Sequence, residues 1–351
     1  MDRILEQINT GCARFTADLL RNNRNEIFAM DYEAAANIIN DALEEDNGEY
    51  KFDPEMEARL LEYLADAGIG AQGVSVYGMR RRQILVRGVD IERSSVTMET
   101  LRSDLGEMCG LELGTPLFEV EKGVTSMILQ AKRKLSVEGA LRNLSADGGV
   151  SGDTVNLFTN RKDYFYSLIC DGMGAGREAA LTSNLCSTFL EKMLRAGNRA
   201  GTSLRMLNNL ILSRCSGSRE ESSSTIDLIE LDLITGEASF IKSGAAPSFI
   251  VRDGRVRRLQ AGTAPIGIIR GLETGTSKFS LRRGDTVVMV SDGITEAEGG
   301  EEWLSELLCD CERLTPEEIV ERISAHAASA ETHDDCSAIA LRITSAEQPA
   351  S

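Results

Sequence analysis

Four aspartates stand at the ends of apolar stretches that we expect to form strands. Asp171 follows "YSLIC", Asp292 closely follows "DTVVMV", Asp153 ends "GVSGD", and Asp334 begins "DDCSAIAL". A fold could bring these side chains together on rigid backbones. A cluster of like charges is unstable unless it binds a metal ion or is partly protonated. The sequence therefore predicts a metal site at these aspartates.

The side chains available in this chain indicate which metal and which chemistry. Carboxylate oxygens select Mg²⁺ or Mn²⁺, whereas zinc prefers histidine and cysteine. The chain has only two histidines, His326 and His333, so histidine-based hydrolysis is improbable. Two metal ions about 3.5 to 4 Å apart could share Asp171, activate a bridging water and neutralise a phosphoryl group during in-line attack. The predicted chemistry is metal-assisted hydrolysis of a phosphate ester.

The loop "DGMGAG" after Asp171 does not match other phosphate-binding loops. The dinucleotide fingerprint needs glycine or alanine where Arg177 stands, and no lysine follows as in a Walker loop. Cys170 and Arg177 are also too far apart for the tight loop of a cysteine phosphatase. A single Asp-Gly pair is more often just a turn. The metal prediction therefore depends on the aspartates taken together.

Composition limits the partners and the location. The 351 residues carry a net charge of −17, which would repel nucleic acid and anionic membrane surfaces. No apolar stretch approaches the length of a membrane helix, and the start lacks the pattern of a secretory signal. The eight cysteines show no zinc-site spacing. We expect a cytoplasmic protein.

The chain divides by sequence texture into five parts. We expect an N-terminal helical segment at residues 1–52, a small α+β domain at 53–122, and a partly helical connector, a candidate switch helix, at 123–148. Short β-rich segments with tight turns and inserted helices fill residues 149–344, and a polar tail covers 345–351. This pattern favours two antiparallel sheets covered by helices.

Local signals place the individual elements. Asp53 as a cap, with Pro54 at the first helical position, predicts a helix that stops at Gly68. A hairpin over 73–90, a helix over 96–108 and a strand at "PLFEVEKG" complete the small domain.

In the β-rich part, helices are predicted over 177–197 and 201–215, and hairpins turn at 235–236 and 253–254. Thr315 and Glu318 form a capping box that begins a final helix. The aspartates thus lie next to predicted strands.

The ordered segments "GGVSGD", "CDGMGAGREA", "SSTIDLIELDL", "GAAPSFIVRDG", "PIGI", "VMVSDGI" and "DDCSAIAL" cover about residues 149–343. Together they resemble the metal-dependent serine/threonine protein phosphatases of the PPM or PP2C class, closest to the bacterial branch represented by stage II sporulation protein E. The region before them resembles the regulatory region of that branch. The resemblance implies an αββα sandwich and two Mn²⁺ or Mg²⁺ ions.

The resemblance also implies roles for matched residues. Asp171 would bridge the metals, Gly172 would offer its carbonyl to the second metal, and Asp153 would ligate or orient water there. Asp292 and Asp334 would bind the first metal. Asp153, Asp171 and Asp292 would thus be the catalytic carboxylates. Asp335 holds a position next to a ligand and is the weaker candidate, while Gly174 and Gly176 would shape the loop.

The implied substrate is a phosphorylated anti-sigma-factor antagonist whose dephosphorylation activates a sporulation sigma factor. The resemblance also implies a link to the membrane or division machinery through an N-terminal region missing from this sequence, and a homodimer is a further expectation. Met173 stands where eukaryotic members have histidine, and no arginine matches their phosphate-binding arginine. Two alternatives stay open, namely a stress-response phosphatase of the same branch and a non-catalytic scaffold with this fold.

Overall fold

The structure is a computed structural model. It describes residues 51–346 with short gaps. The gaps are residues 79–81, 93, 147, 161–162, 175, 216–221, 270, 273, 298 and 330–333. The predicted helical segment at 1–52, apart from its last two residues, lies outside the described residues, as do His333 and the end of the predicted tail. Contacts divide the described chain into two compact units, a small unit at 51–134 and a sandwich unit at 135–346.

The small unit places two helices on one face of an antiparallel sheet. Its sheet order is β1-β2-β4-β3. The elements are α3 Pro54–Asp66, β1 Gly73–Tyr77, β2 Gln83–Arg87, α4 Met98–Cys109, β3 Leu117–Glu121 and β4 Val124–Gln130. Leu60 and Leu64 of α3, Leu101 and Leu105 of α4, and Met127 of β4 are buried in one core. This is the predicted α+β arrangement.

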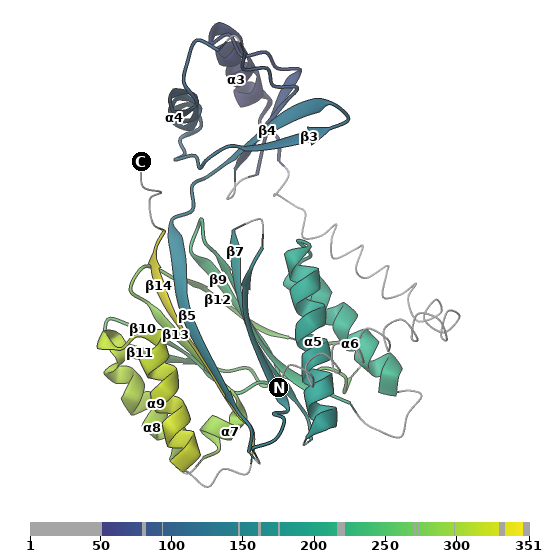
Figure 1. The fold of residues 1–351 in the computed structure, drawn as a ribbon, viewed down its shortest axis with the longest axis vertical. Helices are drawn as coiled ribbons and strands as arrows, with labels where there is room; N and C mark the ends of the chain where they lie inside the picture. Colours follow the sequence, from purple (N-terminus) through teal and green to yellow (C-terminus); the bar gives the residue numbers. More distant parts are fainter. Residues whose placement is uncertain are drawn as a thin grey trace. The chain divides into compact units, whose positions relative to one another are not determined.

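The sandwich unit contains two five-stranded antiparallel sheets (Figure 1). The first has the order β12-β9-β8-β7-β6 and the second the order β11-β10-β13-β14-β5. The first contains β6 Asp153–Thr159, β7 Tyr164–Gly172, β8 Ser224–Asp232, β9 Glu237–Ser243 and β12 Gly275–Ser280. The second contains β5 Leu135–Leu144, β10 Ser248–Arg252, β11 Arg255–Leu259, β13 Thr286–Val290 and β14 Cys336–Ser345.

Helices cover the outer face of each sheet. Figure 1 shows α5 Arg177–Arg195 and α6 Ala200–Cys215 on one side of the sandwich, and α8 Gly300–Cys309 and α9 Pro316–Ser329 on the other. The short helix α7 Asp292–Thr295 follows β13, and a 3-10 turn, Cys311–Arg313, precedes α9. The expected αββα sandwich is therefore confirmed.

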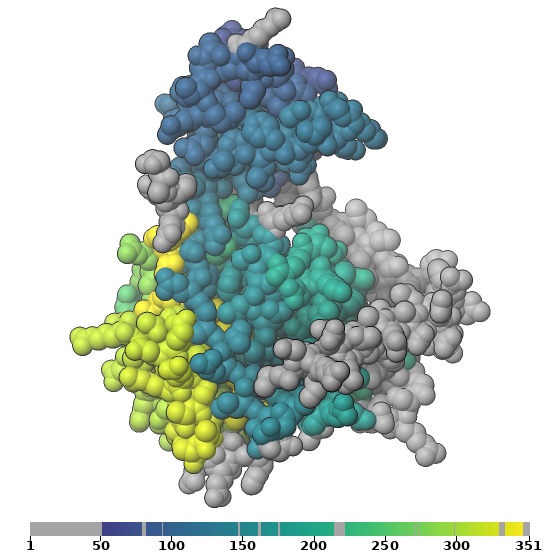
Figure 2. Space-filling view, in the orientation of Figure 1, coloured from purple at the N-terminus to yellow at the C-terminus, as the bar shows by residue number. Residues whose placement is uncertain are grey.

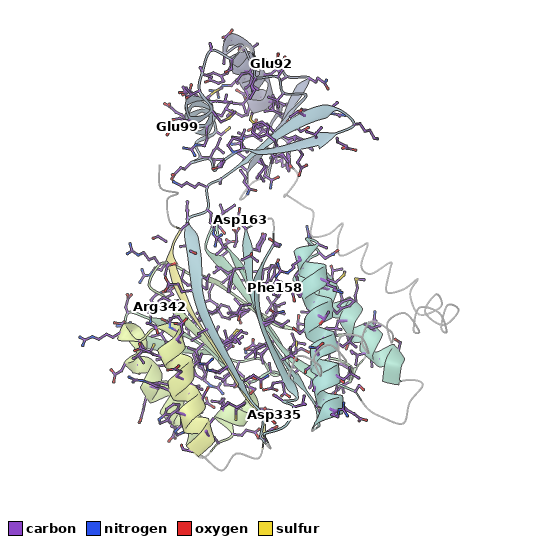
Figure 3. All side chains as sticks on the ribbon, in the orientation of Figure 1. Glu92, Glu99, Phe158, Asp163, Asp335 and Arg342 are labelled. Carbon is purple, nitrogen blue, oxygen red and sulfur yellow. The ribbon has the colours of Figure 1, made fainter. Side chains whose placement is uncertain are left out.

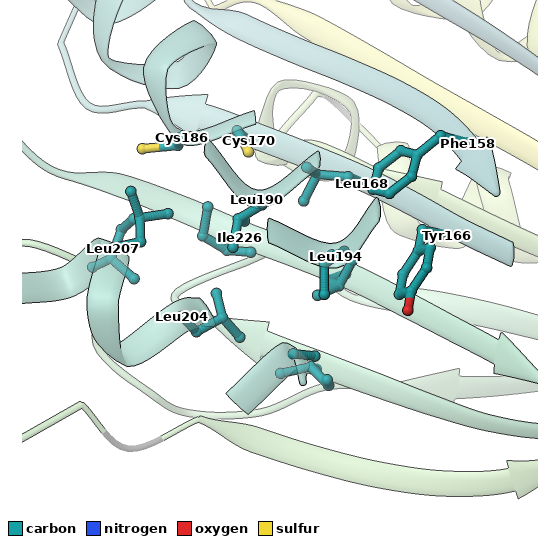
Figure 4. Close-up of a cluster of buried hydrophobic side chains, with 14 of the residues drawn as sticks. Phe158, Tyr166, Leu168, Cys170, Cys186, Leu190, Leu194, Leu204, Leu207 and Ile226 are labelled. Atoms are coloured by element: carbon teal, nitrogen blue, oxygen red, sulfur yellow. The ribbon is translucent and has the colours of Figure 1, made fainter. Parts of the chain in front are cut away.

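Three apolar layers hold the sandwich together, because strand residues alternate between faces. Leu168, Cys170 and Ile226 pack outward against Leu190 and Leu207 of α5 and α6 (Figure 4). Alternate residues of the same strands point into the layer between the sheets. That inter-sheet layer contains Phe165, Ile169, Ile229, Leu231, Phe240, Ile250, Met289, Ile339 and Leu341. A third layer lies under α8 and α9.

The predicted caps and turns form as expected. The Asp53 carboxylate accepts a hydrogen bond from Met56 N at 3.1 Å and caps α3. At the start of α9, Thr315 N donates to Glu318 Oε2 at 2.8 Å, and Glu318 N donates to Thr315 Oγ1 at 3.2 Å. Asp253 has a positive φ of 51°, as a tight hairpin turn requires.

The predicted helical connector at 123–148 is wrong. Residues 124–130 form β4, which pairs with both β2 and β3 and so belongs to the small unit. Residues 135–144 form β5, which pairs along its whole length with β14. Leu135 and Val137 face the inter-sheet layer, and Ala140 and Leu144 face the layer under α9. Apolar residues on both faces of a strand obscure the alternation that marks one.

The boundaries move accordingly. The small unit extends to residue 134 and the sandwich unit begins at 135, rather than at the predicted 122 and 149. In Figure 2, the blue-teal atoms around β5 lie at the surface between the yellow-green C-terminal helices and the teal atoms of α5. No helix within the described residues is long and apolar enough to cross a membrane.

Candidate metal centre

The β6–β7 pair places two of the predicted aspartates side by side. Asp153 begins β6, and it lies directly opposite Asp171 near the end of β7. Directly opposed residues in an antiparallel pair have Cβ atoms about 4.5 to 5.5 Å apart. Asp153 is only 5% exposed. The two carboxylates therefore lie side by side on the inner face of the first sheet, with Asp153 buried and Asp171 partly buried.

The second sheet supplies the other two aspartates. Asp292 is the first residue of α7, directly after β13 and Ser291, and Asp334 lies two residues before β14. These strands are neighbours, and Ser291 N donates to Ser337 O at 2.9 Å where they meet. The pKa of Asp292 is raised by burial and then by the nearby charges of Asp334 and Glu296. Asp292 and Asp334 thus lie close together.

Electrostatics link the two pairs. The pKa of Asp171 is raised to about 8, first by burial and then by the charges of Asp153, Asp292 and Asp334. Burial raises the pKa of Asp153 to about 6, although the hydroxyls of Ser337 and Ser291 oppose this shift. All four predicted aspartates therefore lie within electrostatic reach of Asp171. They cannot all be ionised at neutral pH without a compensating cation.

The residues fit a divalent cation with oxygen ligands. Asp153 Oδ2 is buried and has no hydrogen-bond partner among the described residues. A buried carboxylate oxygen without a partner is costly, and a cation would satisfy it. Within the described residues, however, no three histidine, cysteine, aspartate or glutamate side chains are gathered into a closed site for one ion. Mg²⁺ usually keeps several waters and takes one or two carboxylates, so this looser set is sufficient.

The glycine loop allows α5 to approach Asp171. Gly172 is buried, and a Cβ there would collide with the backbone of Ala179 in the first turn of α5. Gly174 and Gly176 have φ values of 99° and 75°, which favour glycine. Gly176 is the residue at which α5 starts. The loop therefore brings the start of α5 close to the end of β7.

Asp335 differs from the other aspartates in its contacts. Its carboxylate accepts hydrogen bonds from Ala146 N and Gly152 N, so it fixes the loop that leads into β6. A Cβ on Gly293 would collide with the backbone oxygen of Asp335, at 2.2 Å, so the start of α7 packs closely against Asp335. Figure 3 shows Asp335 at the end of the sandwich where α7 lies, and Asp163 at the opposite end. Asp335 therefore holds the candidate centre in place through the backbone.

Serines around the centre were missed from the sequence. Ser224 Oγ donates to the backbone oxygen of Asp171 at 2.8 Å, and Ser337 N donates to Ser291 Oγ at 2.8 Å. Ser224 and Ser337 are fully buried. The available signal was sequence position, since Ser291 directly precedes Asp292, Ser337 follows Asp335 by two residues, and Ser224 begins an apolar strand. Serine at a strand end is too common for that signal to be specific.

A family model described as "Stage II sporulation protein E (SpoIIE)" matches residues 161–344, which is more than half of the chain. The chain belongs to the stage II sporulation protein E family. Stage II sporulation protein E of Bacillus subtilis (strain 168) is 27% identical over 304 residues, covering 82% of this chain and 36% of the relative. Stage II sporulation protein E of Priestia megaterium is 25% identical over 281 residues, covering 76% of this chain and 47% of the relative. The chain thus spans less than half of these SpoIIE relatives.

Solved structures support the fold. The PP2C phosphatase domain of Bacillus subtilis SpoIIE, with a fragment of its regulatory domain, has a TM-score of 0.65 at 23% identity, covering 99% of this chain and 96% of that one. The RsbU and RsbW domains of a Mycobacterium tuberculosis protein have a TM-score of 0.54 at 19% sequence identity, covering 62% of this chain and 64% of that one. A serine/threonine phosphatase from S. agalactiae has a TM-score of 0.52 at 17% sequence identity, covering 59% of this chain and 99% of that one. The predicted resemblance to PP2C-type phosphatases close to SpoIIE is confirmed.

Proposed function

We propose that this chain is a metal-dependent protein serine phosphatase. The observation that carries the proposal is that four aspartates from two sheets lie within electrostatic reach of one another, with the pKa of Asp171 raised to about 8 and a buried oxygen of Asp153 left without a partner among the described residues. Membership of the SpoIIE family and the PP2C-type fold support the same conclusion.

We propose residue roles that follow this placement. Two Mn²⁺ or Mg²⁺ ions would share Asp171. Asp153 and the carbonyl of Gly172 would serve one ion, and Asp292 and Asp334 would bind the other. When bound, two such ions supply an activated water and neutralise phosphoryl charge. The acidic side chains alone would repel a phosphate dianion. The Ser224 hydroxyl and the Asp335 carboxylate hold the backbone around Asp171 and Asp153 in position.

The proposed substrate is a phosphoserine on an anti-sigma-factor antagonist, and its hydrolysis would activate a sporulation sigma factor in the cytoplasm. Both relatives named above are proteins of stage II of sporulation, which favours this pathway over a stress response. Regulation by the small unit, homodimerisation, and links to the membrane or division machinery belong to the same proposal. A non-catalytic scaffold is disfavoured, because the acidic side chains of Asp153 and Asp171 lie side by side, where they disfavour each other's ionisation and a divalent cation would stabilise both carboxylates.

The test is hydrolysis of a phosphoserine protein by the whole chain with Mn²⁺, with and without chelator. Asp171→Asn should lower kcat/KM by roughly 10³-fold, since it removes a shared carboxylate, while the melting temperature stays near that of the wild type. Asp253→Asn is the matched control, because Asp253 is 78% exposed in a hairpin turn that asparagine also suits. Full activity of Asp171→Asn would contradict the proposal. Calorimetry that shows no divalent binding would favour the scaffold.

A further inference from the structure

Three apolar side chains face solvent in two segments that both hydrogen-bond to the start of β8. Met173 directly follows Gly172 and is 52% exposed, and Ile268 and Ile269 are 49% and 42% exposed. We call these three residues the apolar rim. Large apolar side chains gathered at the surface are a mark of interaction sites.

Hydrogen bonds tie both parts of the rim to Asp171. Met173 N donates to Ser223 O at 3.0 Å, and the next residue, Ser224, exchanges two backbone hydrogen bonds with Ile266, at 3.2 and 3.0 Å. The Ser224 hydroxyl in turn donates to Asp171 O at 2.8 Å. Ile268 lies two residues beyond Ile266, and so within roughly 7 Å of it along the backbone. Both parts of the rim are therefore joined through Ser223 and Ser224 to the end of β7 that carries Asp171, with the isoleucine loop on the α6 side of the sheet.

Buried neighbours fix the isoleucine loop. Ile266 is fully buried, and Asn208, only 1% exposed, accepts from Gly267 N at 2.8 Å and donates to Ile269 O at 3.0 Å. Gly267 has a φ of 86°, and a Cβ there would collide with Ile211 and with the backbone of Ser222. The loop is thus held on both sides of Gly267. Ile268 and Ile269 are exposed although the loop itself is firmly anchored.

The rim and the centre together fit one class of ligand. A phosphate would reach the cations held by the aspartates, and the residues that flank it would then lie against the rim. Apolar flanking residues would remove the exposed side chains from water, whereas a small phosphate ester has no such groups. Charged flanking residues would have to lose water against Met173 and the isoleucines.

We propose that Met173, Ile268 and Ile269 bind apolar side chains that flank the phosphoserine of the protein substrate, and so determine specificity. This inference rests on the proposed phosphatase function. The occupant is a phosphoserine segment of a partner protein, with apolar residues beside the phosphorylated position.

The test uses the whole chain with Mn²⁺ and two synthetic phosphoserine peptides. The peptides are identical except that the two residues on each side of the phosphoserine are leucine in one and serine in the other. Wild-type protein should show a kcat/KM about tenfold or more higher for the leucine peptide, since burial of one aliphatic side chain is sufficient for such a factor. The double variant Ile268→Ser with Ile269→Ser should bring this ratio close to one.

Controls separate docking from damage to the centre or the fold. The variant Ile268→Leu with Ile269→Leu should keep the preference, because it keeps the apolar surface. Val120→Ser should keep it too, because Val120 is 72% exposed on β3 of the small unit. Using a ratio of two peptides cancels any common effect on hydrolysis, and melting temperatures report on folding.

Two results would overturn the inference while leaving the phosphatase proposal intact. One is equal hydrolysis of both peptides by the wild type, and the other is a serine double variant that keeps the leucine preference. Failure of the phosphatase proposal would look different. The wild type would then hydrolyse neither peptide, nor p-nitrophenyl phosphate, in a Mn²⁺-dependent manner.

Discussion

Asp171 is the aspartate whose ionisation the fold disfavours most among those of the candidate centre. Its pKa is raised to about 8, while that of its neighbour Asp153 is raised to about 6. Burial is the largest cause for both residues, and the charges of the other aspartates add to it for Asp171. A raised pKa means that the carboxyl keeps its proton up to that pH. At pH 7 Asp171 is therefore mostly protonated in the metal-free protein.

Mn²⁺ binding at pH 7 should release close to one proton. A cation favours the ionised carboxylate, so the proton on Asp171 must leave as the metal enters. At pH 9 the release should be much smaller, because Asp171 has already lost its proton. Calorimetry in two buffers of different ionisation enthalpy measures the number of protons. Identical binding heats in the two buffers at pH 7 would contradict the assignment, and Asp171→Asn should abolish the difference.

At the scale of elements, a buried ion pair joins three strands of the sandwich unit. Lys242 of β9 lies opposite Asp227 of β8, and both side chains are at most 3% exposed. The ammonium donates to Asp227 Oδ2 at 2.6 Å, to Ala246 O at 2.6 Å and to Ser248 Oγ at 2.8 Å. These three bonds use all its donors. They fix the crossing from β9 in one sheet to β10 in the other.

Lys242→Met should destabilise the fold strongly. It leaves the buried carboxylate of Asp227 without its cation, a change that typically costs about 3 to 5 kcal/mol. Chemical denaturation measures the loss. Adding Asp227→Leu should recover part of it, because the uncompensated charge is removed. Arg282→Met is the control, since Arg282 pairs with Asp253 at the surface and such pairs contribute up to about 1 kcal/mol. Equal losses for the two single variants would refute this view.

The β5 strand marks the limit of sequence reasoning in this chain. Hairpins and caps were predictable, because they depend on neighbours such as Thr315 and Glu318. The pairing of β5 with β14 joins Leu144 to Cys336, nearly two hundred positions later, and no local pattern encodes it. The aspartates were found because strand ends are visible in the sequence. The backbone role of Asp335 was not, because it depends on a distant loop.

Removal of β5 should unfold the sandwich unit. A fragment of residues 135–351 should give one cooperative thermal transition, whereas a fragment of residues 149–351 should aggregate. The shorter fragment exposes the ten-residue edge of β14 and the apolar residues that β5 covers. Scattering and calorimetry would distinguish the two fragments. A stable, monomeric 149–351 fragment would show that β5 is dispensable.

At the scale of the whole molecule, the small unit is the candidate regulatory element. Its core is separate, built on residues such as Leu60, Leu105 and Leu129. The solved SpoIIE structure that includes a fragment of the regulatory domain covers 99% of this chain, so the likeness of fold includes this unit. The small unit therefore shares its fold with that structure, and its regulatory role stays a proposal that its removal would test.

Deleting residues 1–134 should then change Mn²⁺ affinity or kcat by about fivefold or more, the lower end of ordinary coupling between sites. The comparison is between the whole chain and the 135–351 fragment, in the same Mn²⁺ titration. The same Mn²⁺ titration on the variant Val120→Ser tests whether this exposed residue of β3 contributes to the regulation. If rate and affinity are unchanged after the deletion, the regulatory role is wrong.

The candidate centre straddles the sandwich. Asp153 and Asp171 belong to one sheet, while Asp292 and Asp334 are attached to the other. Packed sheets lie about 10 Å apart, and that spacing is set by the thickness of the side chains between them. Phe240 and Met289 lie in this layer between the sheets. They therefore help to set the spacing between the two pairs of aspartates. Changing the size of these side chains would alter the spacing between the two pairs of aspartates, and with it their affinity for divalent ions.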